Sequence, residues 1–390
     1  YAMSVNGSGF IIFTDEYGHT INMNTGPYVP GSFTNPIAIG TNAGFSNQQT
    51  GAVAIGFGAG QTWQSTGAIA IGQSAGASTQ GVSSIAIGNA TGQTLQGTLS
   101  VAIGPSAGAG TQGAASVAIG NVAGQSVQGA NSVAIGPNAG ALIQGAASVA
   151  IGNVAGQSAQ GAGAVAIGSF AGNLSQRQDT IAIGVNAGQT FQNRTSIAIG
   201  YNAGAQSQGI ECISIGSLAG QSAQNAGAIA MGLNSGSVIQ GINSIAIGTN
   251  AGQSVQGASS IAIGVEAGRT NQDTFAVAIG PNSGSVTQGT NSVAIGSSAG
   301  RSVQGASSIA IGVEAGRTNQ STSSVAVGSN AGASTQGVSS VAIGNAAGQT
   351  LQGASSIAIG PNAGASTQGD YALAFGYNTG QVSQGDYAIS

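Results

Sequence analysis

The chain has 390 residues, of which 70 are glycine, 4% are charged and 4% are aromatic, and its formal net charge is −4. So few charges cannot provide the mixed charged surface of an ordinary soluble domain, and so few rings cannot fill a large globular core. The lack of any basic stripe excludes nucleic acid as a partner. Gly or a polar residue also interrupts every apolar stretch well before the roughly 18 residues of a membrane span.

Residues 1–34 carry no repeat and form the first of two predicted domains, an N-terminal cap or irregular segment. They include the apolar run Phe10-Ile11-Ile12-Phe13 and the single histidine, His19. We expect this run to cover the open strand edge of the domain that follows, since an uncovered edge would pair with other chains. His19 is expected to pack within or on the cap rather than to bind a ligand.

Residues 35–390 form the second domain, in which a 16-residue unit occurs 22 times, followed by a partial one, without insertion or deletion. From Ser132 the unit reads S-[VI]-A-I-G-x-N-A-G-x-[ST]-x-Q-G-x-x. A disordered chain of similar composition has no reason to keep such a frame, whereas a stack of repeats in mutual contact does. Three columns, meaning sets of equivalent positions, never vary. Two of the columns are glycine, and we predict that their first members are turn glycines: Gly40, Gly44, Gly56 and Gly60. The third is glutamine, and we predict that it forms a structural ladder, which begins with Gln48, Gln64, Gln80, Gln96, Gln112 and Gln128.

Each repeat predicts two short strands joined by turns. Residues 133–135 alternate apolar and small side chains with the period of two that is typical of a strand. At residues 138–140, Asn-Ala-Gly indicates a turn with positive φ. A second short strand should follow with the Ser/Thr and Gln columns on one face, and Gly145 opens the next turn. We therefore predict an all-β fold, a parallel β-solenoid (β-roll) of 16-residue two-strand rungs, about 4.8 Å apart and about 105 Å long in total.

The two faces of the first strand predict different environments. We expect the apolar face, with Val133 and Ile135, to line the interior beside the glutamine column, whose amides then bond to one another up the stack. The small-residue face, with Ser132, Ala134 and Gly136, should pack closely against a second surface. This face predicts a homo-oligomer.

The unit at residues 132–140, Ser-Val-Ala-Ile-Gly-Pro-Asn-Ala-Gly, resembles the head repeats of trimeric autotransporter adhesins, and the resemblance covers residues 37–390. It is also similar to the AIG-x-x-AG repeat arrays of giant-virus and phage fibre proteins. The resemblance implies a left-handed β-roll, usually trimeric, that serves as an adhesive or stalk module. The period of this chain is two residues longer than is typical of the adhesin repeat.

No residue pattern indicates catalysis, a cofactor or a metal site, and we predict that the protein is not an enzyme. The single cysteine, Cys212, occupies a column of Ser and Ala, where a small packed residue is expected. Glu266/Arg269 and Glu314/Arg317 predict solvated ion pairs. Asp is too rare in the turns for a calcium-binding β-roll.

These observations favour a structural fibre or adhesin shaft, a rigid extracellular, cell-surface or virion-surface rod that assembles through its small-residue face. Its expected partners are copies of itself, with a trimer favoured or end-to-end stacking, and a surface receptor or glycan. Trp63 and Phe191, in an outward variable column, are candidates for stacking on a glycan. Two alternatives remain: an end-to-end filament subunit, since the sequence stops inside a strand, and an ice-binding solenoid. Residues such as Leu142 interrupt the continuous Thr ladder that ice binding would favour.

Overall fold

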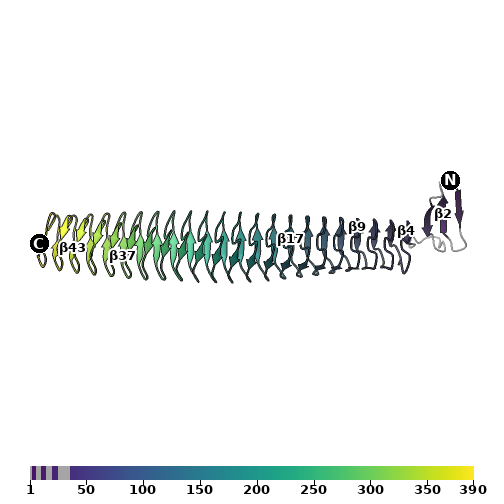
Figure 1. Ribbon diagram of the computed structural model, residues 1–390, viewed down its shortest axis with the longest axis horizontal. Coiled ribbons are helices and arrows are strands. Elements are labelled where there is room, and N and C mark those ends of the chain that lie inside the picture. Colours follow the sequence, from purple (N-terminus) through teal and green to yellow (C-terminus); the bar gives the residue numbers. More distant parts are fainter. Residues whose placement is uncertain (1, 6–9, 15–19, 25–35) are drawn as a thin grey trace. The chain divides into compact units, whose positions relative to one another are not determined.

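A computed structural model describes residues 2–5, 10–14, 20–24 and 36–390 of the chain. Every secondary-structure element assigned in these residues is a β-strand. The chain divides into two units, Tyr1–Phe191 and Gln192–Ser390. Within each unit the repeats form stacked rungs (Figure 1).

Three strands of the first unit precede the repeats and form an antiparallel sheet in the order β1-β2-β3. They are β1 (Ala2–Val5), β2 (Phe10–Thr14) and β3 (Thr20–Asn24). The predicted apolar run lies in β2, where Phe13 pairs with Met3 of β1 and Ile21 of β3. Its role as a cap stays a prediction, and His19 lies outside the described residues.

Each rung contains a first strand of three residues and a second strand of two. In the first unit the first strands are β4 (Ile37–Ile39), β5 (Val53–Ile55), β7 (Ile69–Ile71), β9 (Ile85–Ile87), β11 (Val101–Ile103), β13 (Val117–Ile119), β15 (Val133–Ile135), β17 (Val149–Ile151), β19 (Val165–Ile167) and β21 (Ile181–Ile183). Its second strands are β6 (Trp63–Gln64), β8 (Thr79–Gln80), β10 (Leu95–Gln96), β12 (Thr111–Gln112), β14 (Val127–Gln128), β16 (Ile143–Gln144), β18 (Ala159–Gln160) and β20 (Ser175–Gln176). The division between the units falls within β22 (Phe191–Gln192).

The second unit repeats the same pair of strands. Its first strands are β23 (Ile197–Ile199), β25 (Ile213–Ile215), β27 (Ile229–Met231), β29 (Ile245–Ile247), β31 (Ile261–Ile263), β33 (Val277–Ile279), β35 (Val293–Ile295), β37 (Ile309–Ile311), β39 (Val325–Val327), β41 (Val341–Ile343), β43 (Ile357–Ile359) and β45 (Leu373–Phe375). Its second strands are β24 (Ser207–Gln208), β26 (Ala223–Gln224), β28 (Ile239–Gln240), β30 (Val255–Gln256), β32 (Asn271–Gln272), β34 (Thr287–Gln288), β36 (Val303–Gln304), β38 (Asn319–Gln320), β40 (Thr335–Gln336), β42 (Leu351–Gln352) and β44 (Thr367–Gln368).

In the repeats of each unit, the strands pair in parallel with the equivalent strands of the next rung, 16 residues away. Ala118 of β13 lies opposite Ala134 of β15, and Gln128 of β14 lies opposite Gln144 of β16. Each sequence column therefore becomes a row of equivalent residues along the stack. The predicted parallel β-solenoid of 16-residue two-strand rungs is confirmed.

Two turns close each rung, and four backbone positions in them have positive φ. In one rung these are Gly136 (φ 122°), Asn138 (56°), Gly140 (55°) and Ala147 (54°). The predicted turn at residues 138–140 is confirmed. In the other turn the residue with positive φ is Ala147 rather than Gly145, so the glycine that opens this turn has no need of a left-handed backbone.

Two valines occupy a left-handed position, the one that Asn138 holds in its own rung. Val122 and Val154 have φ values of 63° and 62° there, and a β-branched residue in this region is strained, whereas Asn tolerates it. We predict that Val122→Asn and Val154→Asn each raise the free energy of unfolding by about 1 kcal/mol. Urea denaturation followed by circular dichroism measures the change.

Val127→Asn is the matched control for these two variants. Val127 is solvent-exposed, whereas Val122 and Val154 are half-buried, and the φ of Val127 is not positive. The same substitution there relieves no backbone strain. Equal gains in stability at positions 122 and 127 would contradict the strain argument.

Candidate functional site

The interior of each rung is lined by alanine, serine, glycine and one glutamine. Ala134 of the first strand and Ala139 of the following turn are both fully buried, as is Ser132. The same two alanine columns form continuous buried clusters along the stack, for example Ala54, Ala59, Ala70, Ala75 and Ala86. The glutamine of the second strand is the largest side chain that is fully enclosed.

The prediction that the Val/Ile columns line the interior is wrong. Val133 and Ile135 are half-buried and face outward, and Ile103 is 36% exposed. The reason is the width of the rung: a Cβ placed on Gly76 would lie only 3.4 Å from the Cβ of Ala70 across the interior. A side chain larger than alanine has no room at that place.

The same observation corrects the predicted role of the small-residue face. Its close partner is the turn of its own rung, because Ala134 is already fully buried within the single chain. This face is therefore unable to contact another copy. Assembly through the small-residue face is excluded, and the Val/Ile face is the one left open.

The glutamine column ties the second strand of each rung back to the first. Gln64 Nε2 donates a hydrogen bond of 2.7 Å to the carbonyl oxygen of Val53 and one of 3.1 Å to that of Ala68. Val53 begins the first strand of the same rung, and Ala68 precedes the first strand of the next rung. One amide therefore connects the second strand to the first strands of two successive rungs. The other predicted ladder residues, Gln48, Gln80, Gln96, Gln112 and Gln128, make the equivalent bond to the residue eleven positions earlier, over 2.6–2.8 Å.

Bonds from one glutamine amide to the next occur in only part of the stack. Among the described residues, an Nε2 to Oε1 bond of 3.1–3.2 Å joins Gln160 to Gln176, Gln208 to Gln224, Gln224 to Gln240, Gln256 to Gln272, and Gln272 to Gln288. In the predicted stretch from Gln64 to Gln128, Oε1 is buried without a hydrogen-bond partner. There the in-register stacking and the bonds to backbone carbonyls hold the column together.

The buried amide oxygen explains why one glycine column never varies. A Cβ on Gly60 would lie 2.6 Å from Gln64 Oε1, and one on Gly44 would clash with Gln48 Oε1. The oxygen therefore occupies the space that a side chain on this glycine would need. Gly44 and Gly60 also have φ values of 56° and 52°, so space and backbone both require glycine.

The other invariant glycine column faces the backbone of the next rung. Gly40 and Gly56 have φ values of 121° and 126°. A Cβ on Gly56 would lie 2.7 Å from the carbonyl oxygen of Gly72, and one on Gly40 would lie 2.8 Å from that of Gly56. Any side chain in this column would push adjacent rungs apart. The four predicted turn glycines thus all have positive φ. Gly40 and Gly56 lie against the backbone of the next rung, and Gly44 and Gly60 lie against a glutamine amide.

The serine that precedes the first strand caps the second turn. Ser132 Oγ donates to the carbonyl oxygen of Gly129 at 2.6 Å. Cys212 takes this place in its rung, where Sγ lies 2.9 Å from the carbonyl oxygen of Asn225. Burial raises the pKa of the Cys212 thiol above its usual value, so the thiol is neutral at pH 7. The prediction of a small packed residue at this position is confirmed, since Cys212 is fully buried.

The second strand exposes the variable column, as predicted for Trp63 and Phe191, which are 52% and 58% exposed. The Ser/Thr column does not share the inner face with glutamine. Ser126 is exposed, as is Leu142 in the same column. The reason is that the second strand comprises only two residues, so the residue before it belongs to the outward turn.

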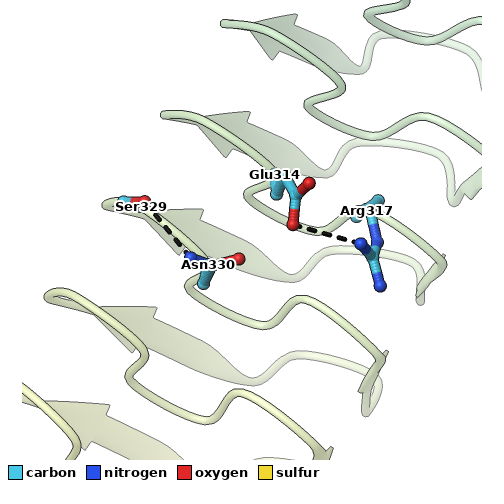
Figure 2. Close-up of polar contacts among 4 residues, drawn as sticks. All are labelled: Glu314, Arg317, Ser329 and Asn330. Carbon is cyan, nitrogen blue, oxygen red and sulfur yellow. Dashed lines mark hydrogen bonds and ion pairs between the residues drawn. The ribbon is translucent and has the colours of Figure 1, made fainter.

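Charged side chains lie in the turns. Arg317 donates to a Glu314 carboxylate oxygen at 3.1 Å, and Arg269 makes the equivalent bond of 3.2 Å to Glu266 (Figure 2 shows the first pair). All four side chains are about one-third exposed or more, which confirms the predicted solvated ion pairs. In the described part of the chain, no three His, Cys, Asp or Glu residues are grouped to hold a metal ion. The same residues contain no helix that is long and apolar enough to span a membrane.

Three stretches of the repeat array match a known family. Each has the outward first strands, the buried alanine and the adjoining glycine turns described above. Residues 128–155, 274–299 and 352–379 match the YadA head domain repeat (2 copies), and each match contains two successive first strands. The matched stretches are YadA-type head repeats. They cover about a fifth of the chain, and the same 16-residue frame continues between them. Comparison with curated proteins and with solved structures gave no match.

The three matched stretches are therefore similar to a repeat of adhesin heads. The sequence features that carry the match also build the solenoid. The alanine lies inside, and the two glycines allow the close approach of backbone and amide. The valine and isoleucine of the motif are left on the outside.

The contact between Gln64 and Gly60 predicts a large difference between two neighbouring glycine substitutions. Gly58→Ala and Gly60→Ala place a side chain at similar φ values of 63° and 52°. At Gly58 the nearest heavy atom is 3.8 Å from the new Cβ, whereas at Gly60 it is 2.6 Å. Both variants add backbone strain, but Gly60→Ala also displaces the buried amide, and we expect it to cost about 2 kcal/mol more.

Urea denaturation of the two variants measures this difference. The position of Gly58 holds alanine in other repeats, as at Ala90 and Ala346, so Gly58→Ala is a fair control for the backbone cost. If both variants lost the same stability, the contact between the amide and the glycine would not limit this column.

Proposed function

We propose that the chain is a structural fibre or adhesin shaft, a rigid rod of stacked rungs on a cell or virion surface, and that it assembles with copies of itself through the Val/Ile face. The observation that carries this proposal is the outward stripe of β-branched side chains along each unit. In the first unit, ten first strands, from β4 to β21, contribute two such side chains each. Their burial is only partial in the single chain.

The size of the stripe supports a stable oligomer. Full burial of a Val or Ile side chain contributes about 1.5–3 kcal/mol, and most of these side chains are exposed by up to about a third, so covering each contributes up to about 0.5–1 kcal/mol. Twenty side chains in one unit then give up to about 10–20 kcal/mol, against an association cost of about 4–15 kcal/mol. Monomeric proteins rarely leave a contiguous apolar patch larger than a few hundred Å² uncovered.

The column two residues beyond the first strand mostly holds polar residues or proline but adds apolar side chains in some rungs. Phe57, Tyr201 and Leu233 are exposed there. The match to YadA-type head repeats supports a trimer and an adhesin-type location on a surface. The absence of charge from the strand columns supports close packing between copies, because no ion needs to be desolvated.

Sedimentation velocity of the purified chain, followed by electron microscopy, tests the proposal. We expect a discrete homo-oligomer, with three copies favoured, that forms short rods of about 105 Å if 22 rungs stack at about 4.8 Å. The variant Ile103→Lys/Ile135→Lys places charge in the stripe and should raise the dissociation constant at least 100-fold. A monomeric native chain would contradict the proposal, and open-ended filaments would favour the end-to-end polymer instead.

Val127→Lys/Ile143→Lys is the matched control. These side chains are 48% and 56% exposed on the second strands, outside the proposed contact. The control should leave the sedimentation coefficient unchanged. Dissociation by the control as well as by the stripe variant would place the contact elsewhere.

A further inference from the structure

A second outward surface of the first unit has a regular pattern with a period of two rungs. We call the position three residues before each fixed glutamine the ridge column. In this unit, long amide side chains alternate in it with short ones, without exception from residue 61 onward. The long residues are Gln61, Gln93, Gln125, Gln157 and Gln189, and the short ones are Ala77, Ala109, Ala141 and Asn173.

The rungs with a long ridge residue also carry an apolar residue on the second strand, two positions later. These residues are Trp63, Leu95, Val127, Ala159 and Phe191, and all five are exposed. The rungs between them mostly carry Thr or Ser at that place, as at Thr79, Thr111 and Ser175. Since rungs are about 4.8 Å apart, an amide and an apolar side chain recur together about every 9.6 Å.

The polar groups of this surface have free bonding capacity. Of the five long ridge residues, Gln93 is exposed and the other four are half-buried, and none has a side-chain hydrogen bond to another described residue. Asn173, between two of them, is only 9% exposed, and its Oδ1 has no hydrogen-bond partner. Like the buried glutamine oxygens of the interior, this acceptor lies within the single chain, so the five long ridge residues are the ones that offer polar groups to a ligand.

The surface also carries no charge. In the first unit, neither the ridge column nor the two columns that follow it contain Asp, Glu, Lys or Arg. Amides both donate to and accept from hydroxyl groups, while the flat rings of Trp63 and Phe191 fit the C–H faces of sugar rings. This combination favours a neutral sugar chain over an anionic polymer.

We propose that this surface of the first unit binds an extended, neutral β-1,4-linked polysaccharide. In such a polymer alternate sugars are turned over, so the same face recurs at every second residue and meets the surface at every second rung. Each contact is weak, and several in a row on one chain combine into useful affinity. This inference is independent of assembly through the Val/Ile face.

The second unit provides an internal contrast, because its alternation is broken. Gln253 and Arg269 are long in successive rungs, and so are Arg301 and Arg317. These arginines also add charge to the ridge column. We therefore assign the binding surface to the first unit.

Isothermal titration of the full chain with a β-1,4-linked glucose hexamer tests the proposal, with the α-1,4-linked glucose hexamer as the comparison probe. The decisive variant is Gln93→Ala/Ala109→Gln, which keeps composition and charge but breaks the two-rung period. Gln349→Ala/Ala365→Gln makes the same exchange in the second unit. Circular dichroism confirms that each variant is folded.

We expect the native chain to bind the β-linked hexamer and not the α-linked one. The exchange in the first unit should weaken binding at least fivefold, and the exchange in the second unit should change it less than twofold. Trp63→Ser/Phe191→Ser should also weaken it. The proposal is overturned if the native chain binds neither hexamer, or if both exchanges have equal effects. Thermal hysteresis of ice growth without hexamer binding would also overturn it, and would assign the surface to ordered water.

Discussion

One glutamine amide in each rung is the interaction on which the rest of the solenoid depends. Its Nε2 bonds to the backbone carbonyl at the start of the first strand, as Gln64 does to Val53, and this bond draws the two strands of a rung together. Its oxygen lies where a side chain on Gly60 would be. The space left inside then admits only small side chains, namely Ala, Ser and, in single rungs, Thr91, Thr180 or Cys212, and every larger apolar side chain lies outward.

The narrow interior determines which side chains remain on the outside of the protein. A core of alanine buries little apolar surface per residue, so covering the half-buried Val/Ile columns would add hydrophobic stabilisation. In the proposed assembly, another copy covers them. The second strands contribute only glutamine to the interior. Their outward side chains vary from Trp63 to Ser175. One face is thus suited to assembly and another to recognition.

The strands and turns were predictable from the sequence because they depend on local periodicity. The first strand at residues 133–135 and the left-handed turn at Asn138 follow directly from alternation and turn chemistry. Which face points inward was not predictable from hydrophobicity, because the width of the rung depends on how the turns bring distant residues together. A signal was present: the alanine column changes only once, to Ser214, whereas the Val/Ile columns also accept Met231 and Phe375.

The stability of two neighbouring substitutions tests the central claim most directly. Ala102 is fully buried, and Ile103 is 36% exposed, so Ala102→Leu overfills the interior while Ile103→Leu leaves it unchanged. Chemical denaturation should show that Ala102→Leu costs about 3 kcal/mol or prevents folding of its rungs, and that Ile103→Leu costs less than about 1 kcal/mol. If Ala102→Leu were tolerated as well as Ile103→Leu, the alanine column would not form the interior.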